Sequence, residues 1–371
     1  MPALLLLTAG PVRPAAAQQF STADSIVESG IRRGIYPGAV LVVGRRDGLL
    51  HAHGFGHLTW GPSTPVPSPD STRWDLASLT KVVATTGAVM RLVEQGRVDL
   101  DAPVRHYLPR FDGADRDQVT VRLLLEHRSG LPSYVPFFKQ TAVRDTGIAL
   151  LYHTPLRHPP GVVTEYSDLN FLLLGLLVEV VSGVPLDQFA EREVLLPAGM
   201  AHTGFRPGLA QRDHTAPTGR WHGRPVCCVV NDQNAALFGG VAGHAGLFAT
   251  AQDLARFAQL WLGLGSLSGR VVFQASTVRD FLKPAGDWLQ GWERANPDHH
   301  LDSAFGQLLS DQAYGHTGWT GTLLWIDPGR DLFMVFLTNR SYDPRVPDSI
   351  RALRGVRGAL ADAAVRAAAG P

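Results

Sequence analysis

The chain has 371 residues, of which 45% are hydrophobic and 18% are charged, and its formal net charge is +1. This length is sufficient to bury a large core, and the composition is far from that of a disordered chain. The arginines are scattered and form no basic stripe, so nothing in the composition indicates nucleic-acid binding.

The first seventeen residues resemble a targeting segment. A short apolar run, Leu4–Leu7, is followed by small residues that end at Ala15-Ala16-Ala17. This order is typical of a secretory signal peptide, although the usual positively charged start is missing, and a disordered Ala/Pro tail is the alternative. We therefore expect residues 1–17 to be a signal peptide and the mature protein to be exported, either periplasmic or secreted. No later apolar stretch is long enough to predict a membrane span.

The early part of the mature chain predicts a helix followed by a hairpin. Residues 21–33 have helical spacing, with Asp24 three residues after Ser21 as a helix start. Residues 39–43 and 49–58 are rich in β-forming residues and flank Arg46-Asp47-Gly48, which predicts a β-hairpin. Residues 79–95 then return to helical spacing.

The remaining elements are helical in the middle of the chain and extended near its end. We expect loops and helices over 99–240, the clearest being an apolar helix over 171–181 that ends at Gly183. A further helix is predicted over 253–262, strands over 321–327 and 332–339, and a helix over 349–369. This order predicts an α/β protein of the α+β type: a mixed, mostly antiparallel sheet from residues 18–75 and 250–371, with a mainly helical region, 99–240, inserted.

The strongest chemical signal is Ser78-Leu79-Thr80-Lys81. A serine hydroxyl is a weak nucleophile until a base takes its proton, and residues three apart on a helix lie on the same face. Lys81 would therefore lie beside the Ser78 hydroxyl. Its amine can act as a base only if burial or a cationic neighbour lowers its pKa. Alone, the Ser-x-x-Lys pattern is weak, because a helix start with a solvated lysine is common.

Two further motifs follow in order. Tyr166-Ser167-Asp168 precedes the apolar helix, and His316-Thr317-Gly318-Trp319 opens the first late strand. A tyrosine phenol can relay a proton, and a strand can offer a backbone N–H to a developing oxyanion. No Gly-x-Ser-x-Gly elbow occurs, which argues against an α/β-hydrolase.

Together these motifs resemble the class C β-lactamase, DD-peptidase and esterase family of penicillin-recognising serine enzymes. The resemblance extends over nearly the whole mature chain, 18–371, which it implies is a single catalytic domain. It rests on the segments 36–39, 75–81, 98–104, 107–109, 123–132, 166–175, 243–250 and 315–321.

The resemblance implies a hydrolase that acts on an amide or ester through an acyl-enzyme, with no cofactor and no metal. Carried over, Ser78 would be the nucleophile, Lys81 its partner and Tyr166 the relay. The N–H groups of Ser78 and Trp319 would form the oxyanion hole, next to substrate-side residues. The substrate-side residues would be Asp168, His316, Thr317 and Gly318. Small molecules or cell-wall D-alanyl peptides would be the substrates.

Two positions depart from the family pattern. Asp168 stands where the family often has Asn, and an anion there would alter the field around Lys81. His316 stands where the family's β-lactamases typically have Lys, and a histidine is only partly charged near neutral pH. Both changes favour a peptidase, amidase or esterase over an efficient β-lactamase, which remains an alternative.

The sequence also admits other interpretations. A non-catalytic peptidoglycan-binding relative would be expected to lack Ser78, Lys81 or Tyr166, and all three are present. A metal site at His51, His53 and His57 is a weaker hypothesis than a solvated strand face. His127 and His244 are expected to stabilise loops, with His244 the better functional candidate, and no role is expected for His299-His300. Cys227 and Cys228 are adjacent, so free thiols and a strained vicinal disulfide both stay open.

Overall fold

The fold is built around a six-stranded antiparallel sheet with the strand order β10-β11-β12-β13-β1-β2. The computed structural model describes residues 19–295 and 303–370. Two strands come from the start of the chain and four from its end, and β1 joins the two sets by pairing with β13. Their bounds are β1 Gly38–Arg45, β2 Gly48–Gly56, β10 Glu293–Arg294, β11 Tyr314–Thr317, β12 Leu323–Asp327 and β13 Leu332–Thr338.

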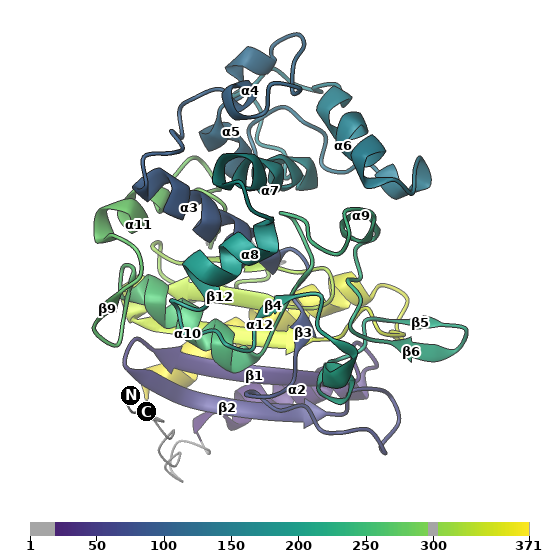
Figure 1. The fold of residues 1–371 in the computed structure, drawn as a ribbon. Coiled ribbons are helices and arrows are strands. Elements are labelled where there is room, and N and C mark those ends of the chain that lie inside the picture. The colour runs from purple at the N-terminus through teal and green to yellow at the C-terminus, as the bar shows by residue number, and fades with distance from the viewer. Residues whose placement is uncertain (1–18, 296–302, 371) are drawn as a thin grey trace, which may run out of the picture.

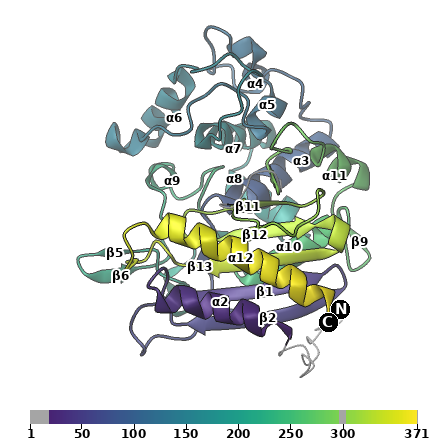
Figure 2. The same cartoon turned by 180° about the vertical axis from the view of Figure 1, so that it is seen from behind.

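Helices cover both faces of this sheet, so its central strands are buried on both sides. Side chains of β1 alternate between two hydrophobic cores: Val40 and Val42 face one, whereas Leu41 and Val43 face the other. The terminal helices α2, Ser21–Arg32, and α12, Ser349–Ala369, lie together over the second core (Figure 2). Helix α10, Ala251–Leu262, packs on the opposite face. Burial on both faces explains why β1 is an unbroken apolar run.

A mainly helical region lies beyond the α10 face of the sheet (Figure 1). Its centre is α7, Asp168–Ser182, which is buried along Leu169–Val178 and ends at Gly183 in a left-handed conformation with φ 78°. The helices around it are α3 Gly87–Glu94, α4 Val104–Tyr107, α5 Val121–Leu125, α6 Arg144–His153, α8 Leu186–Ala190, α9 Gln233–Leu237 and α11 Ala275–Phe281. These layers confirm the predicted fold class.

No single helix of the described residues has the length and apolar character needed to cross a membrane. Helix α7 taken together with the segment Leu186–Leu195 passes that test by composition, but the two are bent by 78°.

Three local predictions differ from the structure. The segment after Ser78 becomes helical at Leu79 but runs as a π-helix over Lys81–Thr86 before α3 begins. Phe20 is the N-cap of α2, and the Asp24 carboxylate instead lies 2.7 Å from His51 Nε2. The His316 segment does not open the strand over 321–327, because it forms a separate strand, β11, which a tight turn connects to β12.

Candidate active site

Ser78 sits in a sharp turn between a short strand and a helix. Strand β3, Trp74–Asp75, pairs with β7, Leu247–Ala249, and the chain then turns through Ala77, whose φ is +48°. A non-glycine residue at positive φ is strained, so other contacts must hold it. The buried Asp75 carboxylate does this by accepting a hydrogen bond from the Ala77 N–H at 2.9 Å. The turn presents Ser78 to a pocket.

Lys81 and Tyr166 both contact the Ser78 hydroxyl. Lys81 Nζ lies 3.0 Å from Ser78 Oγ, and Tyr166 Oη lies 2.8 Å from it. Lys81 Nζ also donates to Tyr166 Oη at 2.6 Å, so the three groups form a closed triangle. Tyr166 comes from the loop that leads into α7, which brings a residue distant in sequence to the nucleophile.

Asp168 completes the surroundings of Lys81. Its Oδ1 accepts from Lys81 Nζ at 2.6 Å, and the two side chains are 17% and 0% exposed. Burial acts to lower the pKa of Lys81, but Asp168 and Tyr166 together hold that pKa above its ordinary value. The sequence analysis required a lowered pKa for Lys81 to act as a base. In the resting site that condition is not met, because Asp168 and Tyr166 raise the pKa and favour the ammonium form.

Tyr166 is a neutral phenol in the resting site. Burial raises the pKa of Tyr166 to about 12, against the lowering effect of Lys81. The ring packs against His127, with centroids 4.7 Å apart, and His127 Nδ1 accepts from the N–H of Ser167 at 3.0 Å. His127 thus stabilises the tyrosine loop, in the structural role expected for it.

The turn after β11 is tied to the Ser78 segment. The hydroxyl of Thr320 donates to the carbonyl of Asp75 at 2.7 Å, and that of Thr322 donates to the carbonyl of Leu76 at 2.9 Å. A Cβ at Gly318 would lie 2.1 Å from Thr322 Oγ1 and 2.5 Å from the Leu76 carbonyl oxygen. Only glycine therefore allows the two segments to approach this closely.

The backbone N–H groups of Ser78 and Trp319 both lie at this junction. Among the described residues, no hydrogen bond is donated by the N–H of Ser78 or of Trp319, and both residues line the same pocket. Two arginines bind the carbonyls next to the second group: Arg357 binds that of Gly318 at 2.9 Å, and Arg340 binds that of Trp319. These contacts fix the peptide planes of the turn.

His316 is buried, 2% exposed, and its Nδ1 lies 2.8 Å from the carbonyl oxygen of Thr317. Burial, with the nearby charge of Lys81, lowers the pKa of His316 to about 3. His316 is therefore neutral near pH 7, where the sequence suggested partial charge. Its side chain supplies no cation to the substrate side of the pocket.

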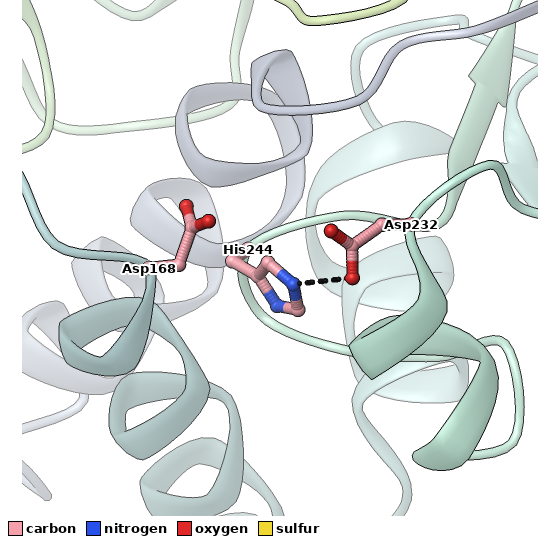
Figure 3. A group of neighbouring side chains, drawn as sticks. All are labelled: Asp168, Asp232 and His244. Carbon is pink, nitrogen blue, oxygen red and sulfur yellow. Dashed lines mark hydrogen bonds and ion pairs between the residues drawn. The ribbon is translucent and has the colours of Figure 1, made fainter. Parts of the chain in front are cut away.

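A second pair of side chains, Asp232 and His244, lies beside this constellation. His244 Nε2 lies 2.9 Å from Asp232 Oδ1 (Figure 3). The backbone carbonyl oxygen of His244 lies 3.4 Å from Lys81 Nζ. Donor atoms of Asp168, Asp232 and His244 all lie within 4.8 Å of one another. Of His127 and His244, the sequence made His244 the better functional candidate. No sequence motif points to Asp232.

The pocket in front of Ser78 has a volume of about 1140 Å³. Seven of the eight predicted site residues line it, and the eighth, Lys81, lies directly behind Ser78. Acidic side chains on its wall include Asp168 and Asp232, and basic ones include Arg354 and Arg357 of α12. A space of this size accepts a ligand larger than a simple ester.

The remaining sequence candidates lie away from the pocket. His51 pairs with Asp24, and His57 Nδ1 lies 2.6 Å from the Thr64 carbonyl oxygen. Cys227 and Cys228 are free, with their sulfur atoms 3.1 Å apart. His299-His300 and residues 1–17 lie outside the described residues.

Comparison with known proteins agrees with this geometry. The family model described as Beta-lactamase matches residues 23–357. This chain belongs to the beta-lactamase family. Its fold, its Ser78-x-x-Lys81 motif and its relatives identify this beta-lactamase-family protein as a serine hydrolase.

Two curated relatives cover most of the chain. The "N-acetylmuramyl-L-alanine amidase" of Bacillus subtilis (strain 168) is 34% identical over 88% of this chain and 83% of that protein. The "Putative D-alanyl-D-alanine carboxypeptidase" of Escherichia coli (strain K12) is 34% identical over 76% of this chain and 72% of that protein.

Solved structures show the same fold at lower identity. A penicillin-binding protein homologue from Caulobacter crescentus has a TM-score of 0.75 and 22% identity, covering 96% of this chain and 99% of that one. A family VIII carboxylesterase has a TM-score of 0.73 and 20% identity, with the same coverage.

Proposed function

We propose that this beta-lactamase-family hydrolase cleaves amide bonds in peptidoglycan fragments through an acyl-enzyme on Ser78. The observation that carries the proposal is the contact of one hydroxyl, Ser78 Oγ, with both Lys81 Nζ and Tyr166 Oη at the edge of a large pocket. The names of the Bacillus subtilis and Escherichia coli relatives, both of which refer to cell-wall amides, support this substrate class.

The proposed chemistry needs no free base in the resting site. Ser78 Oγ attacks the carbonyl carbon and its proton passes to Tyr166 Oη, while the phenolic proton of Tyr166 passes to the leaving nitrogen. Because Lys81 stays cationic beside Asp168, it stabilises negative charge on the phenol oxygen during this transfer. The same relay, run in reverse, activates water to hydrolyse the ester of Ser78.

The carbonyl oxygen would be held by the N–H groups of Ser78 and Trp319. Both are without partners among the described residues, and the arginine contacts to the neighbouring carbonyls orient the second one. Loss of one such donor in other enzymes costs about 100-fold or more in kcat. Thr317 and Gly318 would line the substrate beside this oxyanion hole.

Efficient β-lactam turnover is not favoured. The family's β-lactamases typically carry Lys where this chain has His316, and the buried His316 is neutral. The Asp168 carboxylate on the pocket wall would repel an anionic ligand placed close to it.

Export fits the proposed substrate, since peptidoglycan lies outside the cytoplasmic membrane. The apolar run and the small residues within residues 1–17 support the proposal that the protein is exported. Expression of the whole sequence with and without these residues, followed by fractionation and N-terminal sequencing of the product, tests it. Secretion that does not depend on residues 1–17 would contradict the proposal.

The test of the function is product analysis. Purified protein is incubated with soluble muropeptides, and the products are identified by mass spectrometry, with Ser78→Ala as the control. Release of a terminal D-alanine indicates a carboxypeptidase, and cleavage between the lactyl group and L-alanine indicates a muramyl amidase. If muropeptides remain intact while small esters are hydrolysed, the peptidoglycan assignment is wrong.

A further inference from the structure

The Asp232 carboxylate lies on the pocket wall next to the proposed catalytic groups. It comes from the N-cap of the short helix α9, and its side chain is 25% exposed. Asp232, Ser78, Tyr166 and Asp168 line the same space. Nothing in the proposed acyl transfer uses Asp232.

One oxygen of Asp232 is fixed by the protein and the other is not. Oδ1 accepts from the N–H of Ala235 at 2.7 Å and lies 2.9 Å from Nε2 of the buried His244. Within the described residues, 19–295 and 303–370, no group donates a hydrogen bond to Asp232 Oδ2. Figure 3 shows this second oxygen on the side of the carboxylate that faces Asp168. The carboxylate is held rigidly, with one acceptor left for a ligand.

The ion pairs of Asp168 and Asp232 differ in kind, because the group that faces Asp232 is His244, which is charged only when it is protonated. Asp168 is paired with Lys81 at 2.6 Å, whereas no Arg or Lys of the described chain pairs with Asp232. Burial acts to raise the pKa of Asp232, but His244, the Ala235 N–H and Lys81 together lower it to about 2. Asp232 is therefore an anion throughout the neutral range.

We propose that Asp232 is a specificity-determining residue that binds a positively charged group of the substrate, an ammonium or guanidinium, near the scissile bond. This inference rests on the proposed function and names the kind of substrate it takes. Tyr134 lines the same pocket and is 43% exposed, so its ring is available to a cation as well. A bare metal ion is a poorer occupant than an organic cation, because Lys81 already occupies the Asp168 oxygen.

The test compares matched substrates that differ in one charge. Two pairs of chromogenic esters are used: one pair carries a primary amine or its acetamide on the acyl chain, and the other carries them on the alcohol. Values of kcat/KM are measured for wild type, Asp232→Asn and Asp145→Asn. Asparagine keeps an oxygen that can accept from Ala235 and His244, and Asp145 is an exposed residue outside the pocket.

Wild type and Asp145→Asn are expected to prefer the amine by about tenfold in at least one pair, and Asp232→Asn to lose that preference. Equal rates for amine and acetamide in wild type, in both pairs, would overturn the inference. An equal loss of kcat/KM for the amine and the acetamide in Asp232→Asn would also overturn it, because Asp232 would then act only by supporting His244 and Lys81. Absence of hydrolysis in every case, with no labelling of Ser78 by a phosphonate, would instead overturn the proposed function.

Discussion

Lys81 Nζ donates to Asp168 Oδ1 at 2.6 Å, the same distance at which it donates to Tyr166 Oη. The lysine is completely buried, so this carboxylate is its charge partner in the site. The pair has no net charge, and it fixes the ammonium where it contacts both Ser78 and the phenol. The following predictions depend on this arrangement or on the turn that faces it.

Replacing Asp168 by Asn is expected to shift the pH dependence of activity. The raised pKa of Lys81 keeps it cationic, and activity that needs this cation is lost as pH rises through that pKa. Without the carboxylate, burial dominates and the pKa of Lys81 falls. The alkaline limb of kcat/KM should therefore move to lower pH in Asp168→Asn but not in the exposed Asp145→Asn. An unmoved alkaline limb would argue against a cationic Lys81.

Replacing Lys81 by Met is expected to destabilise the fold as well as to stop catalysis. It leaves a mostly buried carboxylate unpaired, which costs about 3 kcal/mol of unfolding free energy. The double variant Lys81→Met with Asp168→Asn removes the isolated charge and should recover most of that stability without recovering activity. Urea unfolding of wild type, both single variants and the double variant measures the coupling. Strict additivity would mean that the pair contributes nothing.

Replacing Gly318 by Ala is expected to lower kcat and to cost about 1–3 kcal/mol of unfolding free energy, because the added methyl group overpacks the turn. The new methyl group would meet Thr322 Oγ1 at 2.1 Å and the Leu76 carbonyl at 2.5 Å, so the turn must move away from Ser78. A displacement on this scale costs about 100-fold in rate.

The matched control for Gly318→Ala is Gly355→Ala in α12. Nothing lies within 4 Å of the position a Cβ would take at Gly355. This variant should keep full activity and gain about 0.5 kcal/mol of stability. Equal activity of the two variants would contradict the role assigned to the turn.

Replacing His316 by Gln is expected to reduce the loss of stability in acid. The pKa of His316 is about 3 in the folded protein and about 6.5 in the unfolded chain, so its stabilising contribution is complete above pH 6.5 and is lost as pH falls toward 3. Between pH 7 and pH 5 this amounts to about 2 kcal/mol. Urea unfolding at both pH values should show a smaller drop for the variant. The same drop in both proteins would mean that His316 is protonated in the folded state.

Local patterns predicted the parts of the fold that depend on neighbouring residues. The hairpin of β1 and β2, the apolar helix α7 and the helix α12 follow from periodicity and turn residues. The strands β10, with two residues, and β11, with four, are too short for a period to be read. Their formation depends on pairing with neighbouring strands: β11 pairs with β12, and β10 pairs with β11.

For the same reason, only part of the site could be predicted from the sequence. Ser78 lies in the turn just before the helix and Lys81 in its first turn, so their spacing fixes the contact and a pattern could reveal it. The Lys81–Asp168 pair joins residues 87 positions apart, and the Asp232–His244 pair joins two loop residues, so tertiary packing alone determines both. Burial of His316 likewise follows from the sheet and the aromatic residues around it rather than from its own motif.

The central claim, that Ser78 is the nucleophile, is tested most directly by a time course of intact mass after addition of a serine-directed phosphonate. The account predicts one adduct per chain, carried on the peptide that contains Ser78, and no adduct in a folded Ser78→Ala variant. Equal labelling of wild type and Ser78→Ala would contradict the assignment of the nucleophile.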